Sequence, residues 1–133
     1  MLDIILNGRL GTAVDEGIRV EIPHITVPSE LPLSDPDLCA LIMNIVDNAI
    51  AATSKGESPY IMLKIHEKHG QLGITCENSF DPQLKEAEAK KETVPKHGLG
   101  LKIIRQITER YHGLVNAEYA DSNYSIKIAI PLL

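Results

Sequence analysis

Residues 35–53 read DPDLCALIMNIVDNAIAAT, and this stretch carries the clearest structural signal in the chain. Asp35 can cap the free amides of a helix start, and Pro36 at the first helical position loses no hydrogen bond. On a helical wheel one side collects apolar residues, namely Leu38, Ile42, Ile45, Val46, Ala49 and Ile50. The stretch therefore predicts a helix from Pro36 to Thr53 with one face in a core.

Weaker signals on both sides of this helix predict the remaining elements. A helix is expected over residues 2–14, and alternating apolar residues predict strands over 18–22, 60–66, 72–76, 114–119 and 124–130. A last helix is expected over 101–111, ending at His112-Gly113, where the glycine suits a left-handed cap. This order predicts an α+β fold, a two-layer α/β sandwich in which three helices cover one side of a mixed, mainly antiparallel sheet.

The composition is that of one globular domain spanning residues 1–133, with 44% apolar and 23% charged residues. A net charge of −5 without a basic stripe argues against nucleic acid as a partner. No apolar run approaches the ~20 residues of a bilayer span, so we expect no membrane contact by this chain. Cys39 and Cys76 lack neighbours at metal-ligand spacing, which favours buried free thiols over a disulfide.

Asn44, Asp47 and Asn48 share the side of the 36–53 helix opposite its apolar face. The ordinary interpretation is a solvated face. Solvated faces usually carry Lys, Glu, Gln or Arg, however, whereas Asn and Asp inside a helix compete with its backbone hydrogen bonds. The stripe therefore favours a ligand-binding role. Amide oxygens suit Mg²⁺, which binds through few protein groups together with phosphate oxygens.

A second motif, His97-Gly98-Leu99-Gly100-Leu101, stands at the start of the predicted 101–111 helix. Glycines allow a close approach of the backbone, and the amino end of a helix offers free N–H groups to an anion. A tight turn or cap explains such a pair of glycines equally well. The segment lacks the preceding strand of a dinucleotide fingerprint and the GK[ST] of a P-loop.

Together the two motifs resemble those of the GHKL ATPase superfamily, which includes gyrase, chaperone, histidine-kinase and MutL types. Residues 44–49, NIVDNA, are similar to its N box, and residues 98–101, GLGL, are similar to its G2 box. The order of elements matches over essentially the whole chain, which implies the GHKL (Bergerat) sandwich. Further similarity at residues 6–7, 17–18 and 35–39 resembles the peptide-pheromone (quorum-sensing) sensor histidine kinases.

The resemblance implies a role for each matching position. Asn48 would ligate Mg²⁺, Asn44 would line the phosphate end, and Asp47 would lie near the base or sugar. The charged segment 79–97 would be the ATP lid, although a short solvated helix also explains its balanced charges. The expected ATP-binding set is Asn44, Asp47, Asn48, Asn78, Lys96, His97, Gly98, Leu99, Gly100 and Leu101, with Asn44 and His97 as the catalytic pair.

The chain departs from the superfamily pattern at three positions. Asn78 stands where an adenine-binding Asp is usual, and Ala51 replaces a phosphate-side Lys that Lys96, His97 or Lys102 could substitute for. Asn44 occupies the position of the Glu that activates water in the ATP-hydrolysing members. Because an amide cannot take a proton, this departure favours a kinase over an ATPase.

The resemblance therefore implies the ATP-binding catalytic domain of a sensor histidine kinase. MgATP would be its substrate, a histidine-bearing dimerisation domain its direct partner, and a response regulator its indirect partner. The expected location is cytoplasmic, as part of a membrane-bound sensor. An anti-sigma-type serine kinase and a nucleotide-free docking domain are the alternatives. His24, His66, His69 and His112 show no ligand spacing, which favours surface or cap roles.

Overall fold

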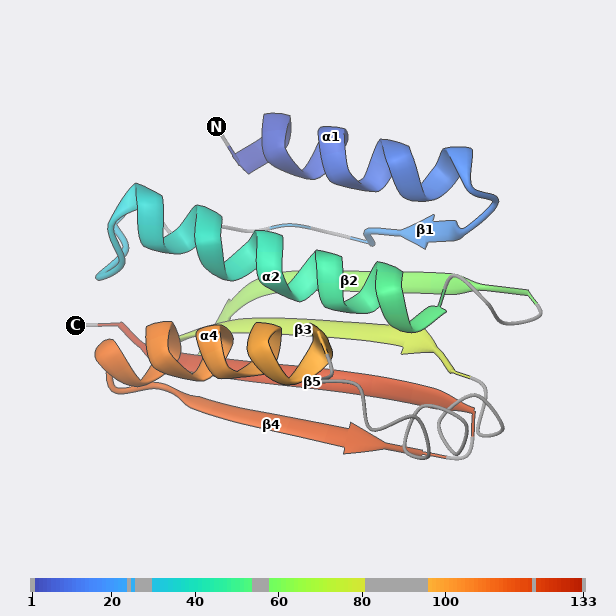
Figure 1. The fold of residues 1–133 in the computed structure, drawn as a ribbon. Helices are drawn as coiled ribbons and strands as arrows, with labels where there is room; N and C mark the ends of the chain where they lie inside the picture. Colours follow the sequence, from blue (N-terminus) through green and yellow to red (C-terminus); the bar gives the residue numbers. More distant parts are fainter. Residues whose placement is uncertain are drawn as a thin grey trace.

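The computed structural model describes residues 2–23, 25, 30–53, 58–80, 96–120 and 122–132, with side chains masked at 2–6 and 96–99. In chain order its elements are α1 (Leu2–Asp15), β1 (Arg19–Glu21), α2 (Asp35–Thr53), β2 (Tyr60–Lys68), β3 (Gln71–Ser79), α4 (Lys96–Arg110), β4 (Leu114–Tyr119) and β5 (Asn123–Pro131). Figure 1 shows these helices in one layer against one face of the sheet. The predicted α+β sandwich is confirmed.

The sheet has the strand order β1-β2-β3-β5-β4. β1 pairs with β2 in parallel, whereas β2 with β3, β3 with β5, and β5 with β4 pair in antiparallel fashion. The two predicted hairpins are therefore present. Because side chains alternate across a strand, every second residue faces the helices. On β3 these inward residues are Leu72, Ile74, Cys76 and Asn78.

The core lies between this inner face and the helices. α2 supplies Leu41, Ile42, Ile45, Val46 and Ala49, α4 supplies Ile104 and Ile107, and α1 supplies Leu10 and Ala13. Cys76 lies in this core as a free thiol, and burial raises its pKa to about 12. Cys39 forms no disulfide among the described residues and is only partly buried, because it precedes the buried stretch that begins at Leu41. The expectation of full burial was therefore wrong for Cys39.

The left-handed residue after α4 is His112, with φ of 64°, and not the predicted Gly113. Gly113 has a different role, since a Cβ there would lie 2.7 Å from the carbonyl oxygen of Ala129 and 2.7 Å from Cγ2 of Thr108. Its amide donates to the Thr108 carbonyl oxygen at 2.9 Å. Glycine is required because the chain passes directly against β5 as it enters β4.

A polar cluster joins the start of α2 to the end of α4. Arg110 Nη1 donates to both carboxylate oxygens of Asp37, at 3.0 and 3.1 Å, and the Tyr111 hydroxyl donates to the same carboxylate. The hydrogen bond from Tyr111, together with those from Arg110, lowers the pKa of Asp37. The two antiparallel helices are thus held together at this end.

Gly113→Ala is expected to lower the free energy of unfolding by about 1–3 kcal/mol, the usual cost of overpacking, because the new methyl group meets β5 backbone. Gly100→Ala is the matched control. It also replaces a glycine by alanine, but no described atom outside the backbone of its own helix lies within 4 Å of its Cβ position, so helix propensity should raise stability by up to about 1 kcal/mol. Urea unfolding of both variants measures the difference, and equal destabilisation would contradict the packing argument.

Asp37→Asn is expected to destabilise the protein at neutral pH and to have little effect in acid. Since the folded-state pKa lies below the usual 3.8, the carboxylate stabilises the fold above about pH 4, and this contribution disappears as the pH falls through the folded-state pKa. Unfolding midpoints of the variant and the wild type are measured at pH 7, 5 and 3, and the difference between them should shrink as the pH falls. Asp35→Asn, in the same helical turn, controls for the helix dipole.

Candidate functional site

Three polar side chains from three elements meet between the helices and the sheet. Asn48 of α2 is 8% exposed, Asn78 of β3 is 2% exposed, and Tyr124 of β5 is 6% exposed. Asn78 and Tyr124 are directly opposite in the β3–β5 register, and the Asn48 side chain is hydrogen-bonded to Tyr124. Figure 1 shows that the end of β3 and the start of β5 lie at the same end of the sandwich as the carboxyl-terminal half of α2. We define these residues as the polar triad.

Asn48 is buried, which corrects the expectation that the whole polar stripe of α2 faces away from the core. The cause is that α2 lies between two other helices and contacts both α1 and α4 as well as the sheet. A central helix buries its flanks in addition to its sheet-facing side. The Asn48 flank therefore requires a polar partner, and Tyr124 supplies it.

The other two stripe residues behave differently from Asn48. Asn44 is partly buried one turn earlier, and its Nδ2 donates to the backbone carbonyl oxygen of Ala40 at 2.7 Å. Asp47 is exposed and forms an ion pair with Arg9 of α1 at 3.4 Å. Asp47 and Asn48 are consecutive and hence about 100° apart around the helix, so the Asp47 carboxylate is directed to α1 and not to the polar triad.

The Asn78 amide has a fixed orientation. Its Nδ2 donates to the backbone carbonyl oxygen of Ser79 at 2.8 Å. Because the nitrogen is used in this bond, the amide oxygen is the atom that remains to accept a hydrogen bond from a ligand. The departure from the usual Asp therefore preserves an acceptor at this position.

A hydroxyl cluster fixes the end of β3 that carries Asn78. The hydroxyls of Thr53 and Ser79 are hydrogen-bonded to each other, and the Tyr60 amide donates to Ser79 Oγ at 3.0 Å. These contacts join the end of α2 to β2 and β3. This cluster was not predicted from the sequence, where its only signal is the position of Thr53 and Ser79 at the ends of their elements.

An aromatic cluster, also not predicted from the sequence, lies beside the polar triad. The ring centroids of Phe80 and Tyr119 are 4.9 Å apart, and those of Tyr119 and Tyr124 are 4.5 Å apart. Tyr119 remains 54% exposed. Burial raises the pKa of Tyr124, and the hydrogen bond from Asn48 acts in the opposite direction. A signal was present, because Tyr119 and Tyr124 flank the short turn between the last two predicted strands.

The glycine motif lies inside α4, which begins at Lys96 and not at Leu101 as predicted. Two glycines cost only about 2 kcal/mol in a helix, which the apolar packing of α4 can offset. Gly100 has open space around its Cβ position, and Leu101 is packed partly against the core. The side chains of Lys96, His97 and Leu99 and most of the expected lid, residues 81–95, lie outside the described residues.

Among the described residues, no group of three or more His, Cys, Asp or Glu side chains is arranged to hold a metal ion. A divalent cation at the polar triad would therefore rest on neutral amide oxygens and on ligand phosphates, which is the donor set that Mg²⁺ accepts. Within the same described segments, no helix is both long and apolar enough to span a bilayer.

Comparison with solved structures identifies close matches in fold. The chain superposes on the catalytic domain of the histidine kinase ThkA with a TM-score of 0.71 and 22% identity, covering 97% of this chain and 88% of that one. The mycobacterial sensor histidine kinase MprB matches with a TM-score of 0.69 and 16% identity, covering 98% and 95%. The Acinetobacter baumannii histidine kinase AdeS matches with a TM-score of 0.72 and 14% identity, covering 98% and 62%.

At these identities the likeness establishes the fold. A search of curated proteins finds no match. The family comparison is more direct, because the sequence profile of the GHKL domain matches residues 33–131, from the segment before α2 to the end of β5. The polar triad and the glycine motif both lie within this match, and the chain belongs to the GHKL domain family.

Proposed function

We propose that this chain is the ATP-binding catalytic domain of a sensor histidine kinase, which presents the γ-phosphoryl group of MgATP to a histidine on a separate dimerisation domain. The observation that carries the proposal is the polar triad, in which Asn48 and Asn78 lie buried at one end of a GHKL fold. The three solved structures reported above are all histidine kinases, which favours histidine over serine as the acceptor.

The base end of the site is assigned to Asn78. With its nitrogen donating to the Ser79 carbonyl, the amide oxygen can accept a hydrogen bond from the adenine amino group. The aromatic cluster of Phe80, Tyr119 and Tyr124 offers apolar surface next to this acceptor. Adenine recognition thus combines one fixed acceptor with aromatic contact.

The phosphate end is assigned to Asn48 and Asn44. Asn48 is hydrogen-bonded to Tyr124, and its amide oxygen is the atom that would bind Mg²⁺. Mg²⁺ would neutralise charge on the phosphates during transfer. Asn44 holds its nitrogen on the Ala40 carbonyl and offers no proton acceptor for water activation. These residues suit positioning and phosphoryl transfer better than hydrolysis.

The amino end of α4 is assigned to the triphosphate, because its free N–H groups and partial positive charge favour an anion. Lys96, His97, Gly98, Leu99, Gly100 and Leu101 belong to this segment, with His97 in the catalytic pair.

A response regulator would receive the phosphoryl group from the acceptor histidine. The parent protein would be a membrane-bound sensor with this domain in the cytoplasm.

Asn48→Ala is expected to abolish the strengthening of ATP binding by Mg²⁺ and to cost about 1–3 kcal/mol of stability, because the Tyr124 hydroxyl loses its buried partner. Tyr124→Phe is the control, since it removes the same hydrogen bond but keeps the Asn48 amide. Calorimetric titration with ATP, with and without Mg²⁺, compares the two. If both variants retain the same response to Mg²⁺, Asn48 is structural and the metal assignment fails.

Asn78→Ala is expected to weaken ATP binding by up to about 100-fold, through loss of one buried hydrogen-bond acceptor. Asn78→Asp keeps an acceptor oxygen but cannot donate to the Ser79 carbonyl, so it should retain the preference for ATP over GTP while lowering stability. Competition of ATP and GTP against a fluorescent nucleotide measures both effects. Equal affinities in wild type and both variants would show that Asn78 does not contact the base.

A further inference from the structure

On the face of the sheet opposite the helices, one row across the strands has small residues at its two central positions. In register across β2, β3, β5 and β4 this row is His66, Gly73, Ala129 and Leu114. Gly73 and Ala129 have almost no side chain, so the surface of the sheet is recessed here relative to the neighbouring rows. None of the described helices covers this side of the sheet (Figure 1).

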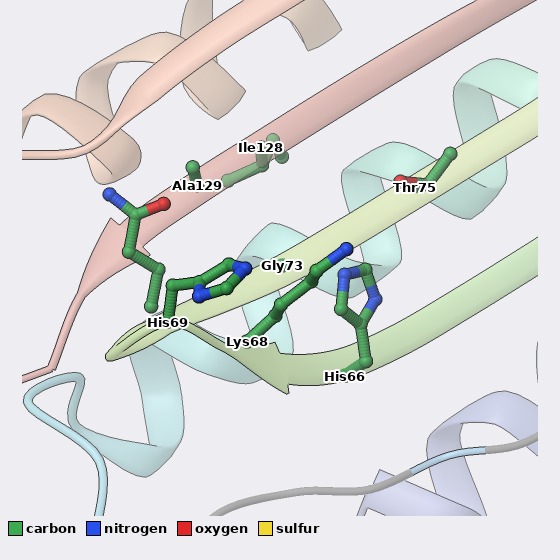
Figure 2. A pocket seen from close by; sticks show the side chains of 8 residues that line it. His66, Lys68, His69, Gly73, Thr75, Ile128 and Ala129 are labelled. Carbon is green, nitrogen blue, oxygen red and sulfur yellow. The ribbon is translucent and has the colours of Figure 1, made fainter.

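A hollow of about 190 Å³ lies over these small residues. The polar side chains that line it are those of His66, Lys68, His69, Gln71 and Thr75. Figure 2 shows the nitrogen-bearing ends of His66, Lys68 and His69 gathered above the strands around Gly73. The hollow is therefore lined by side chains that can donate hydrogen bonds, and no carboxylate of the described residues lines it.

Two backbone features place the imidazoles at this hollow. The β2–β3 turn is His69-Gly70, with φ of 53° and 72°, which is the tight left-handed turn that joins two antiparallel strands directly. At Gly73, a Cβ would lie 2.7 Å from Nε2 of His66 and 2.8 Å from its Cε1. The missing side chain of Gly73 thus provides the space in which the His66 ring lies against the sheet.

The charge of this region is not balanced locally. Lys68 lines the hollow, and Lys64 and Lys127 flank Thr75 in the next row. None of these three lysines forms a salt bridge with another residue in the described part of the chain, although the chain as a whole carries a net charge of −5. Unpaired cations around a donor-lined hollow are suited to an anion.

We propose that this hollow binds a phosphate-sized oxyanion, free or as a phosphate monoester. Lys68 supplies the charge, His66 and His69 supply imidazole N–H groups, and Gln71 and Thr75 complete the donors. The site lies on the opposite side of the sheet from the polar triad, so it is separate from the proposed nucleotide site and does not depend on it. Its ligand would regulate or localise the domain without occupying that site.

The test is a titration of the ¹⁵N-labelled chain with sodium phosphate, compared with sodium chloride at equal ionic strength. Phosphate should produce saturable amide shifts at residues 66–75 and 128–129, with a dissociation constant on the order of 1 mM, typical of a small exposed site. Chloride should not. Equal shifts with chloride, or phosphate shifts confined to residues 44–48 and 96–101, would overturn the proposal.

Three variants separate a built site from general surface charge. Lys68→Gln should weaken phosphate binding about tenfold, as expected for loss of a charge-assisted hydrogen bond. Lys127→Gln removes the same charge from the same face outside the hollow and should change affinity less than twofold. Gly73→Ala should also weaken binding with no change in charge, because its methyl group displaces the His66 ring. Equal weakening by Lys68→Gln and Lys127→Gln would contradict the site.

O-phosphoserine in place of inorganic phosphate distinguishes the two sources of the oxyanion. Tighter binding of the monoester identifies a phosphorylated molecule as the ligand, and tighter binding of the inorganic ion identifies free phosphate. Either result supports the proposal only if Lys68→Gln weakens binding of that probe and the amide shifts remain at the residues of the hollow. Absence of saturable binding by both probes overturns it.

Discussion

The packing of α2 on the inner face of the sheet is the constraint from which the rest of the structure follows. Leu41, Ile42, Ile45 and Val46 are 1% exposed or less, and removing them from water supplies much of the driving force for folding. α1 and α4 then pack on its two flanks. A helix enclosed on three sides has little room for polar side chains, so those it retains must be paired. This requirement produces the contact between Asn48 and Tyr124.

The architecture could be predicted from the sequence because its signals are local. In strands β2, β3 and β5 apolar residues recur at every second position over most of the strand, and α2 begins at a strong capping signal, so their types and order were confirmed. The start of α4 was placed five residues late, at Leu101 and not Lys96, because two glycines weaken a helix without preventing it. The left-handed position expected at Gly113 lies at His112, and the contact with β5 that excludes a side chain at Gly113 could not be predicted because it is long-range.

Two residues of the polar triad could be named from the sequence, but its contacts could not. Asn48 and Asn78 lie in recognisable motifs, whereas Tyr124, which is opposite Asn78 in register and hydrogen-bonded to Asn48, lies far along the chain and has no motif of its own. Asp47 is the converse case, in which neighbours in the sequence do not share a site. Its position beside Asn48 in sequence suggested a shared site, whereas the helical rotation of about 100° between them directs Asp47 to Arg9. Only the packing of three helices decides which polar residue faces which neighbour.

The family match begins at residue 33, and the described elements before it, α1 and β1, contact the remaining fold through α2 and β2. β1 adds three residues to the sheet edge, and α1 contributes Leu10, Ala13 and the exposed Arg9–Asp47 ion pair. Such an ion pair contributes little free energy. The attachment of α1 therefore rests on the burial of Leu10 and Ala13, and local unfolding of this helix is limited by the apolar surface that it would expose to water.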